Sequence, residues 1–305
     1  MSAPLSVVVP TRDRPELLET CLTFLRSSLR DGDELIVVDS ASADERVASV
    51  AVAHGATYVR AERPGASHAR NLGWRRAAHD IVAFVDDDVR VSPRWAGAVA
   101  EAMAPPDRSF VVGRVEVPPE QGLVERPVAI RTGDDGEVLT PGTTGTVGHS
   151  ANLAVRRPWL DGVGGFDELL GAGGRFRAAE DNDLFDRLFA AGGTGWYEPT
   201  ALGWHDQWRD RREKLRIDLA YGVGSGARFR KLAVTDRSRL RHTSAQFLWH
   251  DGLVPLARAV RRNYRFGMAV RSLRLIGTAL GFVAAWTCRV EEGHLRRRRR
   301  ATNRS

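Results

Sequence analysis

Apolar and polar positions alternate along the first 117 residues in blocks that predict strands and helices in turn. Short runs rich in β-branched residues predict strands at Leu5–Val9, Glu34–Val38, Thr57–Arg60, Ile81–Val85 and Phe110–Val117. Between them, apolar residues recur at helical spacing over Pro15–Leu29, Asp44–His54, Ser67–Ala78 and Pro93–Met103. Strands that alternate with helices of this length predict βαβ units and a mainly parallel sheet.

The pattern is less regular after residue 117. Residues 118–147 contain several prolines and glycines and predict a long loop, and long loops in compact domains often carry function. A strand is predicted over Val147–Arg156, a helix over Glu180–Ala191, and a strand-like segment over Trp196–Leu202. We therefore expect an α/β domain over residues 1–210 that divides near residue 117.

Charge separates this domain from the rest of the chain. The net charge is +7, but residues 1–208 hold 21 basic and 31 acidic residues, whereas residues 209–305 hold 24 and 7. We expect residues 211–305 to form a helical, basic extension. The two cysteines exclude a disulfide framework, and the N-terminus lacks a signal-peptide pattern, so a cytoplasmic location is expected.

Three aspartates come directly after the fourth predicted strand. In an extended or turning chain alternate residues point the same way, so Asp86 and Asp88 are expected to converge while Asp87 points elsewhere. Two carboxylates that close favour a cation between them, and oxygen ligands suit Mg²⁺ or Mn²⁺ together with substrate phosphates. His205 is the candidate third protein ligand, because Mn²⁺ also accepts imidazole.

Further polar residues lie at the expected ligand edge of the sheet, beyond the carboxyl ends of the strands. Asp39 ends the second strand and can accept hydrogen bonds from a ribose or a base. Arg70 can reach a diphosphate with its planar guanidinium. Glu180 and Asp181 open a helix after a glycine-rich stretch, where a general base could be presented.

The segment after the first predicted strand argues against several enzyme classes. Pro10–Arg14 contains no glycine-rich dinucleotide fingerprint, which disfavours a nicotinamide-dependent dehydrogenase. It also contains no phosphate-loop lysine, which disfavours an ordinary ATPase.

Taken together and in order, these motifs resemble a family 2 glycosyltransferase with the GT-A fold over about residues 4–210. The matching stretches are Val7–Pro15, Val37–Ser40, Ala69–Gly73, Phe84–Asp88, Asn152 before Arg156 and Arg157, Gly164–Glu168, and Glu180 with Asp181. The resemblance implies a mixed, mainly parallel sheet flanked by helices. It also implies inverting transfer of a sugar from a nucleotide-diphosphate sugar to a glycan, lipid-linked or small-molecule acceptor.

The resemblance also implies a role for each matching residue. Asp88 would hold the metal, Asp86 would lie on the ribose side, and Asp181 would be the base with Glu180 beside it. Residues 1–117 would be the nucleotide-sugar half and residues 118–210 the acceptor half. The candidates for binding nucleotide and substrate are Pro10, Thr11, Arg12, Asp39, Arg70, Asn71, Asp86, Asp87, Asn152 and Gly165.

Two other function classes are weighed against this one. A nucleotidyltransferase on a related α/β fold would also use aspartates and Mg²⁺, but it would usually need a glycine- and lysine-rich loop near the N-terminus. A nucleic-acid-binding protein could use the basic C-terminal region, since basic patches favour polyanions. No reader motif accompanies the arginines, so we expect no nucleic-acid partner.

The C-terminal region has the features of a peripheral membrane anchor. Leu275–Cys288 is a run of 14 uncharged residues, shorter than the about 20 that a spanning helix needs. Arg258, Arg261, Arg262 and Arg265 recur at helical spacing, and Arg296–Arg300 form a polybasic tail. The alternatives are contact with the inner face of the plasma membrane, or a helix packed on the catalytic domain with a disordered tail.

Overall fold

The computed structural model describes residues 2–122, 124 and 127–298. The chain forms two compact units. Unit 1 comprises Met1–Phe166 and Leu184–Trp208, and unit 2 comprises Asp167–Asp183 and Arg209–Ser305. The division after Trp208 lies two residues from the boundary expected at residue 210. The sequence did not indicate that residues 167–183 group with the C-terminal part.

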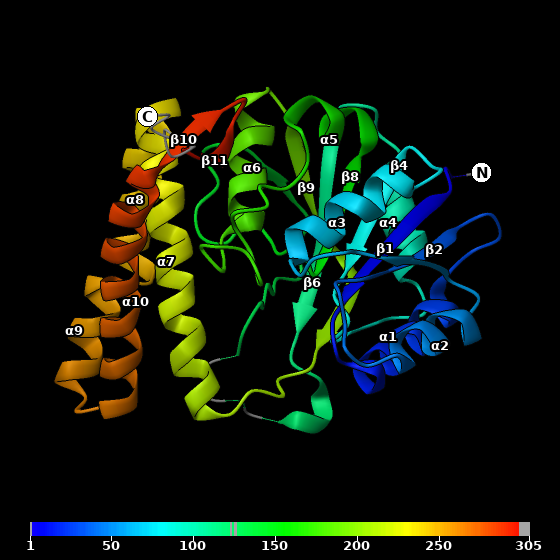
Figure 1. Ribbon diagram of the computed structural model, residues 1–305, viewed down its shortest axis with the longest axis horizontal. Helices are drawn as coiled ribbons and strands as arrows, with labels where there is room; N and C mark the ends of the chain where they lie inside the picture. Colours follow the sequence, from blue (N-terminus) through cyan, green and yellow to red (C-terminus); the bar gives the residue numbers. More distant parts are fainter. Residues whose placement is uncertain (1, 123, 125–126, 299–305) are drawn as a thin grey trace, which may run out of the picture. The chain divides into compact units, whose positions relative to one another are not determined.

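Unit 1 is built on one mixed sheet (Figure 1). Its strands in the described residues are β1 (Leu5–Thr11), β2 (Glu34–Asp39), β3 (Thr57–Arg60), β4 (Ile81–Val85), β5 (Val89–Val91), β6 (Arg108–Glu116), β7 (Glu137–Leu139), β8 (Asn152–Arg156) and β9 (Thr194–His205). They lie in the order β3-β2-β1-β4-β8-β6-β9-β5, with β7 paired to β9. β8 runs antiparallel between β4 and β6, whereas β3, β2, β1 and β4 are parallel. The expected mixed, mainly parallel sheet is confirmed.

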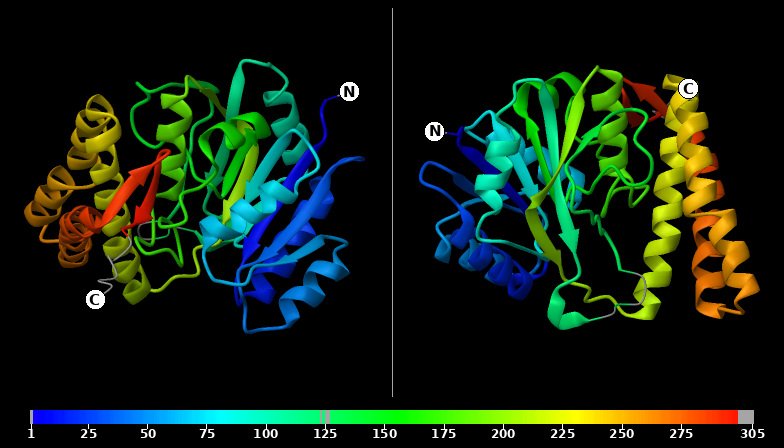
Figure 2. Two further views of the ribbon diagram at one scale, coloured as in Figure 1. Left: turned by 45° about the horizontal axis from the view of Figure 1, so that its top comes forward. Right: turned by 180° about the vertical axis from the view of Figure 1, so that it is seen from behind.

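Helices cover both faces of this sheet (Figure 2). They are α1 (Pro15–Ser28), α2 (Arg46–Ala53), α3 (Ala66–Arg76), α4 (Trp95–Ala102), α5 (Arg157–Val163) and α6 (Glu180–Ala190), whose first turn belongs to unit 2. Val7 and Val9 of β1 pack in one core with α1, α2 and α4, and Val8 packs in the other core with α3, α5 and α6. This split follows from the alternation of side chains along a strand.

Four short elements of unit 1 were not predicted. β5 has three residues and α5 has seven, too few to give a clear periodic pattern. The expected loop over residues 118–147 contains β7 and the short 3-10 helix η1 (Pro119–Gln121). β8 begins at Asn152, five residues later than the expected start at Val147.

Unit 2 consists mainly of helices that follow β9, and the expected helical C-terminal region is confirmed. They are α7 (Arg211–Thr235), α8 (Arg237–His250), α9 (Leu253–Arg261), α10 (Arg265–Ala284) and the 3-10 helix η2 (Ala285–Thr287). α7 begins at a capping box. Glu213 N donates to Asp210 Oδ1 over 2.8 Å, and Asp210 N donates to Glu213 Oε2 over 3.1 Å.

Glycines allow α7 and α10 to pack backbone against backbone. Gly222 and Gly226 on α7 face α10, and Gly277 and Gly281 on α10 face α7. A Cβ atom added at Gly226 would collide with the Thr278 carbonyl oxygen. The four-residue spacing places each pair of glycines on one face of its helix, which is the arrangement that closely packed helices use.

The C-terminal expectations are corrected in two respects. The uncharged run is part of a longer helical segment, Arg265–Thr287, whose 23 residues are long and apolar enough to cross a membrane by length and composition alone. Arg271 and Arg274 lie within this helix, and both pair with Asp251. Arg296 and Arg297 lie in a hairpin of β10 (Cys288–Glu291) and β11 (His294–Arg297), not in a free tail. Arg299 and Arg300 lie outside the described residues.

Candidate active site

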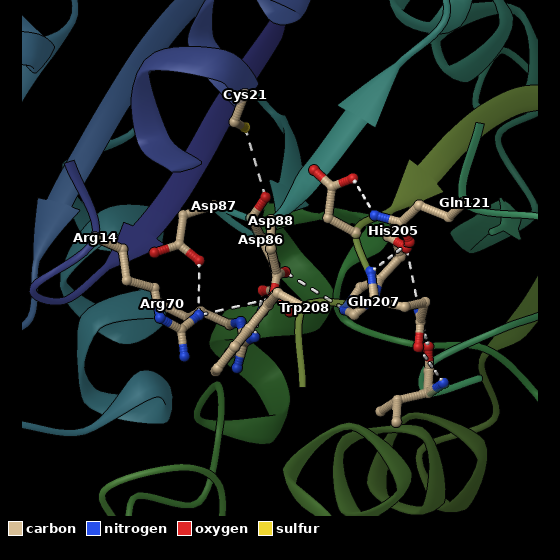
Figure 3. A network of polar contacts seen from close by, with 12 residues as sticks. Arg14, Cys21, Arg70, Asp86, Asp87, Asp88, Gln121, His205, Gln207 and Trp208 are labelled. Carbon is tan, nitrogen blue, oxygen red and sulfur yellow. Dashed lines mark hydrogen bonds and ion pairs between the residues drawn. The ribbon is translucent and has the colours of Figure 1, made fainter. Parts of the chain in front are cut away.

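The three aspartates after β4 lie in a turn and not in an extended segment. Val89 N donates to Asp86 O over 3.1 Å, which closes the turn before β5 begins. The expectation that Asp86 and Asp88 converge while Asp87 points elsewhere is wrong. Asp87 and Asp88 both lie beside the Arg14 guanidinium, at 3.1 and 3.6 Å, whereas Asp86 pairs with Arg70 (Figure 3).

Asp87 is buried within the turn. Its Oδ2 accepts a hydrogen bond from Thr11 Oγ1 over 2.7 Å, and its Oδ1 accepts one from Arg14. Burial and the neighbouring charge of Asp88 raise the pKa of Asp87 to about 7, although Arg14 and the Thr11 hydroxyl oppose the shift. Thr11 and Asp87, both predicted to bind nucleotide, are thus brought together at the ends of β1 and β4.

Asp88 is the metal-ligand candidate that lies beside His205. Its Oδ1 lies 3.4 Å from His205 Nε2, and its Oδ2 accepts a hydrogen bond from Trp208 Nε1 over 3.0 Å. His205 Nδ1 lies 2.8 Å from Gln207 Nε2, a contact that fixes the imidazole ring and leaves Nε2 on the side of Asp88 (Figure 3). His205 at the end of β9 therefore lies next to Asp88, as expected from the sequence.

Asp86 does not join that pair. Its Oδ1 accepts from Arg70 NH2 over 2.6 Å, and Arg70 is itself buried with its guanidinium carbon 5.5 Å from the centre of the Phe166 ring. In the described part of the chain, no group of three or more His, Cys, Asp or Glu side chains could hold a metal ion. The expected trio of Asp86, Asp88 and His205 is therefore not assembled, because the turn directs Asp86 toward Arg70.

Asp39 lies at the end of β2 among partners that the sequence analysis missed. Its carboxylate accepts hydrogen bonds from Tyr58 Oη, Arg60 NH1 and Ser42 N, each over 2.7 Å. Burial and the bond to Asp39 raise the pKa of Tyr58. The signal for Arg60 was available, since parallel pairing of β2 with β3 places Arg60 directly opposite Asp39.

The remaining nucleotide candidates differ in exposure. Pro10 is buried within β1, opposite Val38 of β2. Arg12 comes after the end of β1, with half of its side chain exposed and a 3.4 Å ion pair to Asp13. Arg12 is therefore accessible to a ligand, whereas Pro10 is not.

Asn71 and Asn152 use their amides within the protein. Asn71 Nδ2 donates to Phe166 O and Asn71 Oδ1 accepts from Phe166 N, both over 2.8 Å, so it holds the turn that contains Gly165. A Cβ atom at Gly165 would lie 2.5 Å from Asn71 Oδ1, and its φ of +71° also favours glycine. Asn152 Oδ1 accepts from Trp95 Nε1 over 2.8 Å, and its Nδ2 donates to two backbone carbonyls. Ligand binding by these residues stays a prediction.

With this geometry described, comparison with known proteins decides the family. The model of glycosyl transferase family 2 matches residues 6–164, more than half of the chain. This chain belongs to glycosyl transferase family 2. The match ends at Gly164, so His205 and the candidate bases Glu180 and Asp181 lie beyond it.

Individual relatives agree with the family 2 assignment. The chain is 32% identical over 235 residues to a pre-mycofactocin glycosyltransferase of Mycobacterium tuberculosis, an alignment that covers 73% of this chain and 46% of the relative. It therefore spans about half the length of that protein. The succinoglycan biosynthesis protein ExoM of Rhizobium meliloti is 28% identical over 208 residues, with 65% of each chain covered.

Solved structures show the same fold. The mannosyltransferase PcManGT from Pyrobaculum calidifontis, in complex with GDP-Man and Mn²⁺, aligns with a TM-score of 0.61 at 20% identity. The alignment covers 93% of this family 2 chain and 88% of PcManGT. The expected GT-A fold is confirmed by this likeness.

The candidate bases of this family 2 chain lie in unit 2. Glu180 and Asp181 occupy the first turn of α6, where the helix dipole stabilises a carboxylate. Asp181 Oδ1 accepts a hydrogen bond from Asn182 N over 2.7 Å and one from Asn182 Nδ2 over 3.1 Å. The aspartate turn after β4 belongs to unit 1, so the role of Asp181 as base stays a prediction.

A buried lysine pairs with two aspartates in the same part of unit 2. Lys231 Nζ on α7 lies 2.9 Å from Asp167 Oδ2 and 2.5 Å from Asp183 Oδ1, and all three side chains are at most 4% exposed. Asp167 Oδ2 also accepts a hydrogen bond from Leu295 N of β11 over 2.6 Å. The sequence analysis missed this cluster, because no local pattern relates Lys231 to residues 48 or more positions away.

Proposed function

We propose that this chain is an inverting glycosyltransferase that moves a sugar from a nucleotide-diphosphate sugar to an acceptor hydroxyl, with a divalent cation as cofactor and Asp181 as the base. The observation that carries the proposal is the pair of Asp88 and His205 at the strand ends of a family 2 fold. The similar PcManGT, whose complex contains GDP-Man and Mn²⁺, supports this choice of donor class and cation.

The donor set around Asp88 suits a divalent cation. A carboxylate and an imidazole oriented by Gln207 are ligands that Mn²⁺ accepts, and diphosphate oxygens would complete the coordination. Such a cation would neutralise negative charge that develops on the departing nucleotide diphosphate. We assign Asp88 and His205 as its protein ligands, and Mg²⁺ is the alternative ion.

Different side chains would bind the nucleoside and the diphosphate of the donor in this proposal. Asp39 with Tyr58 and Arg60 would bind the nucleoside through the carboxylate at the end of β2. Arg14 and Arg70 provide positive charge beside the aspartate turn, which favours binding of the diphosphate there.

The transfer is proposed as a single displacement at the anomeric carbon. The acceptor oxygen forms its bond to that carbon while the bond to the diphosphate oxygen breaks, and the hydroxyl proton goes to the Asp181 carboxylate. Attack from the face opposite the leaving group inverts the anomeric configuration. The acceptor classes that we propose are a glycan, a lipid-linked sugar or a small molecule, and the proposed location is the cytoplasm.

Asp88→Asn tests the metal and nucleotide assignment. This change preserves the shape of the side chain and removes the charge that a cation needs. We expect Mn²⁺-dependent binding of GDP, UDP or dTDP, whichever the wild type prefers, to weaken at least about 10- to 100-fold, the loss typical of disturbing the support of a metal site. Isothermal titration with and without Mn²⁺ measures it.

Asp31→Asn is the matched control, because it makes the same chemical change at an exposed position of unit 1. It should leave the Mn²⁺ dependence as in the wild type. If Asp88→Asn binds nucleotide with the wild-type dependence on Mn²⁺ while it remains folded, Asp88 is not the metal ligand and the site has been misplaced.

A further inference from the structure

Exposed apolar side chains are concentrated in unit 2. Among the described residues, unit 1 exposes only Val52, Val138 and Trp208 as large apolar side chains, whereas the helical part of unit 2 exposes ten. Scattered single residues of this kind need no explanation, but a concentration on one group of helices indicates a surface that binds something.

Four of these residues form an apolar stripe on and after α10. Ile276, Leu280 and Val283 are 53%, 56% and 68% exposed, and Trp286 comes next at 57% in η2. The first three recur at steps of four and three residues, so they share one side of the helix. That side is rotated by about a third of a turn from the glycines that contact α7, since about 3.6 residues make one turn, so the stripe is not part of the glycine face. Only 22% of the most apolar 18-residue stretch of Arg265–Thr287 is buried, whereas a core helix is mostly buried.

Arginines lie on both sides of the stripe along the chain. Arg258, Arg261, Arg262 and Arg265, which we call the basic cluster, are exposed at the end of α9 and the start of α10. Within the described residues, none of the four forms an ion pair with an acidic side chain. On the other side, Arg289 and Arg296–Arg298 are exposed in and after the β10–β11 hairpin (Figure 1).

We propose that the apolar stripe and the basic cluster bind the surface of an anionic lipid membrane. The positive charge of residues 209–305 favours a membrane over a second copy of the chain as the binding partner. Residues 209–305 carry 24 basic and 7 acidic residues, so two copies would repel each other at this surface, whereas anionic lipid would attract both. An apolar face with arginines beside it is the pattern of a helix that lies in a membrane interface.

The packing on α7 argues that α10 lies along the membrane surface and does not cross it. The two helices contact each other through Gly222, Gly226, Gly277 and Gly281, and the Arg274–Asp218 ion pair of 2.9 Å joins them. If α10 crossed the bilayer, α7 would have to follow with its charged residues, which is unfavourable in hydrocarbon. Binding along the surface keeps these charges among protein and headgroups.

Vesicle flotation with the full-length chain tests the proposal, which is independent of the proposed activity because no donor is needed. Wild type should float with vesicles of phosphatidylcholine and phosphatidylglycerol at low salt, and poorly with phosphatidylcholine alone. The double variant Ile276→Glu with Leu280→Glu should reduce the bound fraction with anionic vesicles at least about tenfold. Arg261→Gln with Arg262→Gln should reduce it about fivefold per arginine, and only where anionic lipid is present.

Val52→Glu with Val138→Glu is the matched control, because both residues are exposed apolar side chains of unit 1. It should float like the wild type. The proposal is overturned if folded wild type stays unbound in the presence of anionic vesicles, or if the stripe variant binds as the wild type does. It is also overturned if light scattering shows a wild-type dimer that the stripe variant converts to monomer, since the stripe would then be a contact between copies.

Discussion

Asp181→Asn should lower turnover by about 10²–10⁴-fold, the usual contribution of a positioned general base, and leave nucleotide affinity nearly unchanged. The amide has the size of the carboxylate and still accepts a hydrogen bond from Asn182, but it cannot take the acceptor proton. Steady-state rates at saturating donor, together with titration of the nucleotide, separate the loss in turnover from a loss in binding.

Glu180→Gln is the matched control, because it removes a carboxylate from the same helical turn. We expect it to retain most of the activity. Wild-type turnover in Asp181→Asn combined with a large loss in Glu180→Gln would transfer the role of base to Glu180. A product with retained anomeric configuration, determined by NMR, would contradict the single displacement with either residue.

Lys231→Met should destabilise unit 2 by about 3–5 kcal/mol, because removal of one partner leaves buried charge uncompensated. Asp167 and Asp183 would keep two carboxylates in surroundings from which water is excluded. Because the chain has two units, a single unfolding midpoint is not the right measure. Hydrogen exchange at the Leu295 amide, which donates to Asp167, reports on this cluster directly.

Two further variants separate loss of charge balance from loss of packing. Arg216→Met makes a similar change at an exposed position of α7 and should leave exchange at Leu295 nearly unchanged. Addition of Asp167→Asn and Asp183→Asn to Lys231→Met removes the unbalanced charges and should restore part of the lost stability. If Lys231→Met lowers the free energy of unfolding of unit 2 by less than about 1 kcal/mol, this cluster contributes little to stability and the prediction is wrong.

The parts of the fold that the sequence predicted well are those with strong local patterns. β3 and β4 have the expected bounds, because β-branched runs are recognisable within a few residues. The edge of the sheet that carries the candidate ligand-binding residues could also be predicted, since parallel strands end on the same side of a sheet. The orientation of Asp86, Asp87 and Asp88 could not be predicted in this way. It depends on a turn closed by one backbone hydrogen bond, which the strand pattern does not indicate.

Contacts between residues far apart in the sequence could not be predicted either. Nothing near Lys231 indicates Asp167 or Asp183, and Tyr58 became a partner of Asp39 only through the register of two neighbouring strands. The length of the α10 segment was underestimated, because Arg274 bounds the uncharged run although it lies within the helix and pairs with Asp218 and Asp251. A charged residue in the sequence therefore does not mark the end of a helix when it can form an ion pair with a distant residue in the folded protein.

The path of the chain between its two units limits how this protein could have been assembled from modules. The chain passes from one unit to the other after Phe166, within α6 after Asp183, and again after Trp208. A gene fusion at a single point would therefore separate Asp167 from Lys231 and from the Leu295 amide. A chimaera with another member of the family would need to exchange residues 167–183 together with the C-terminal helices, so these two segments should be inherited as one block.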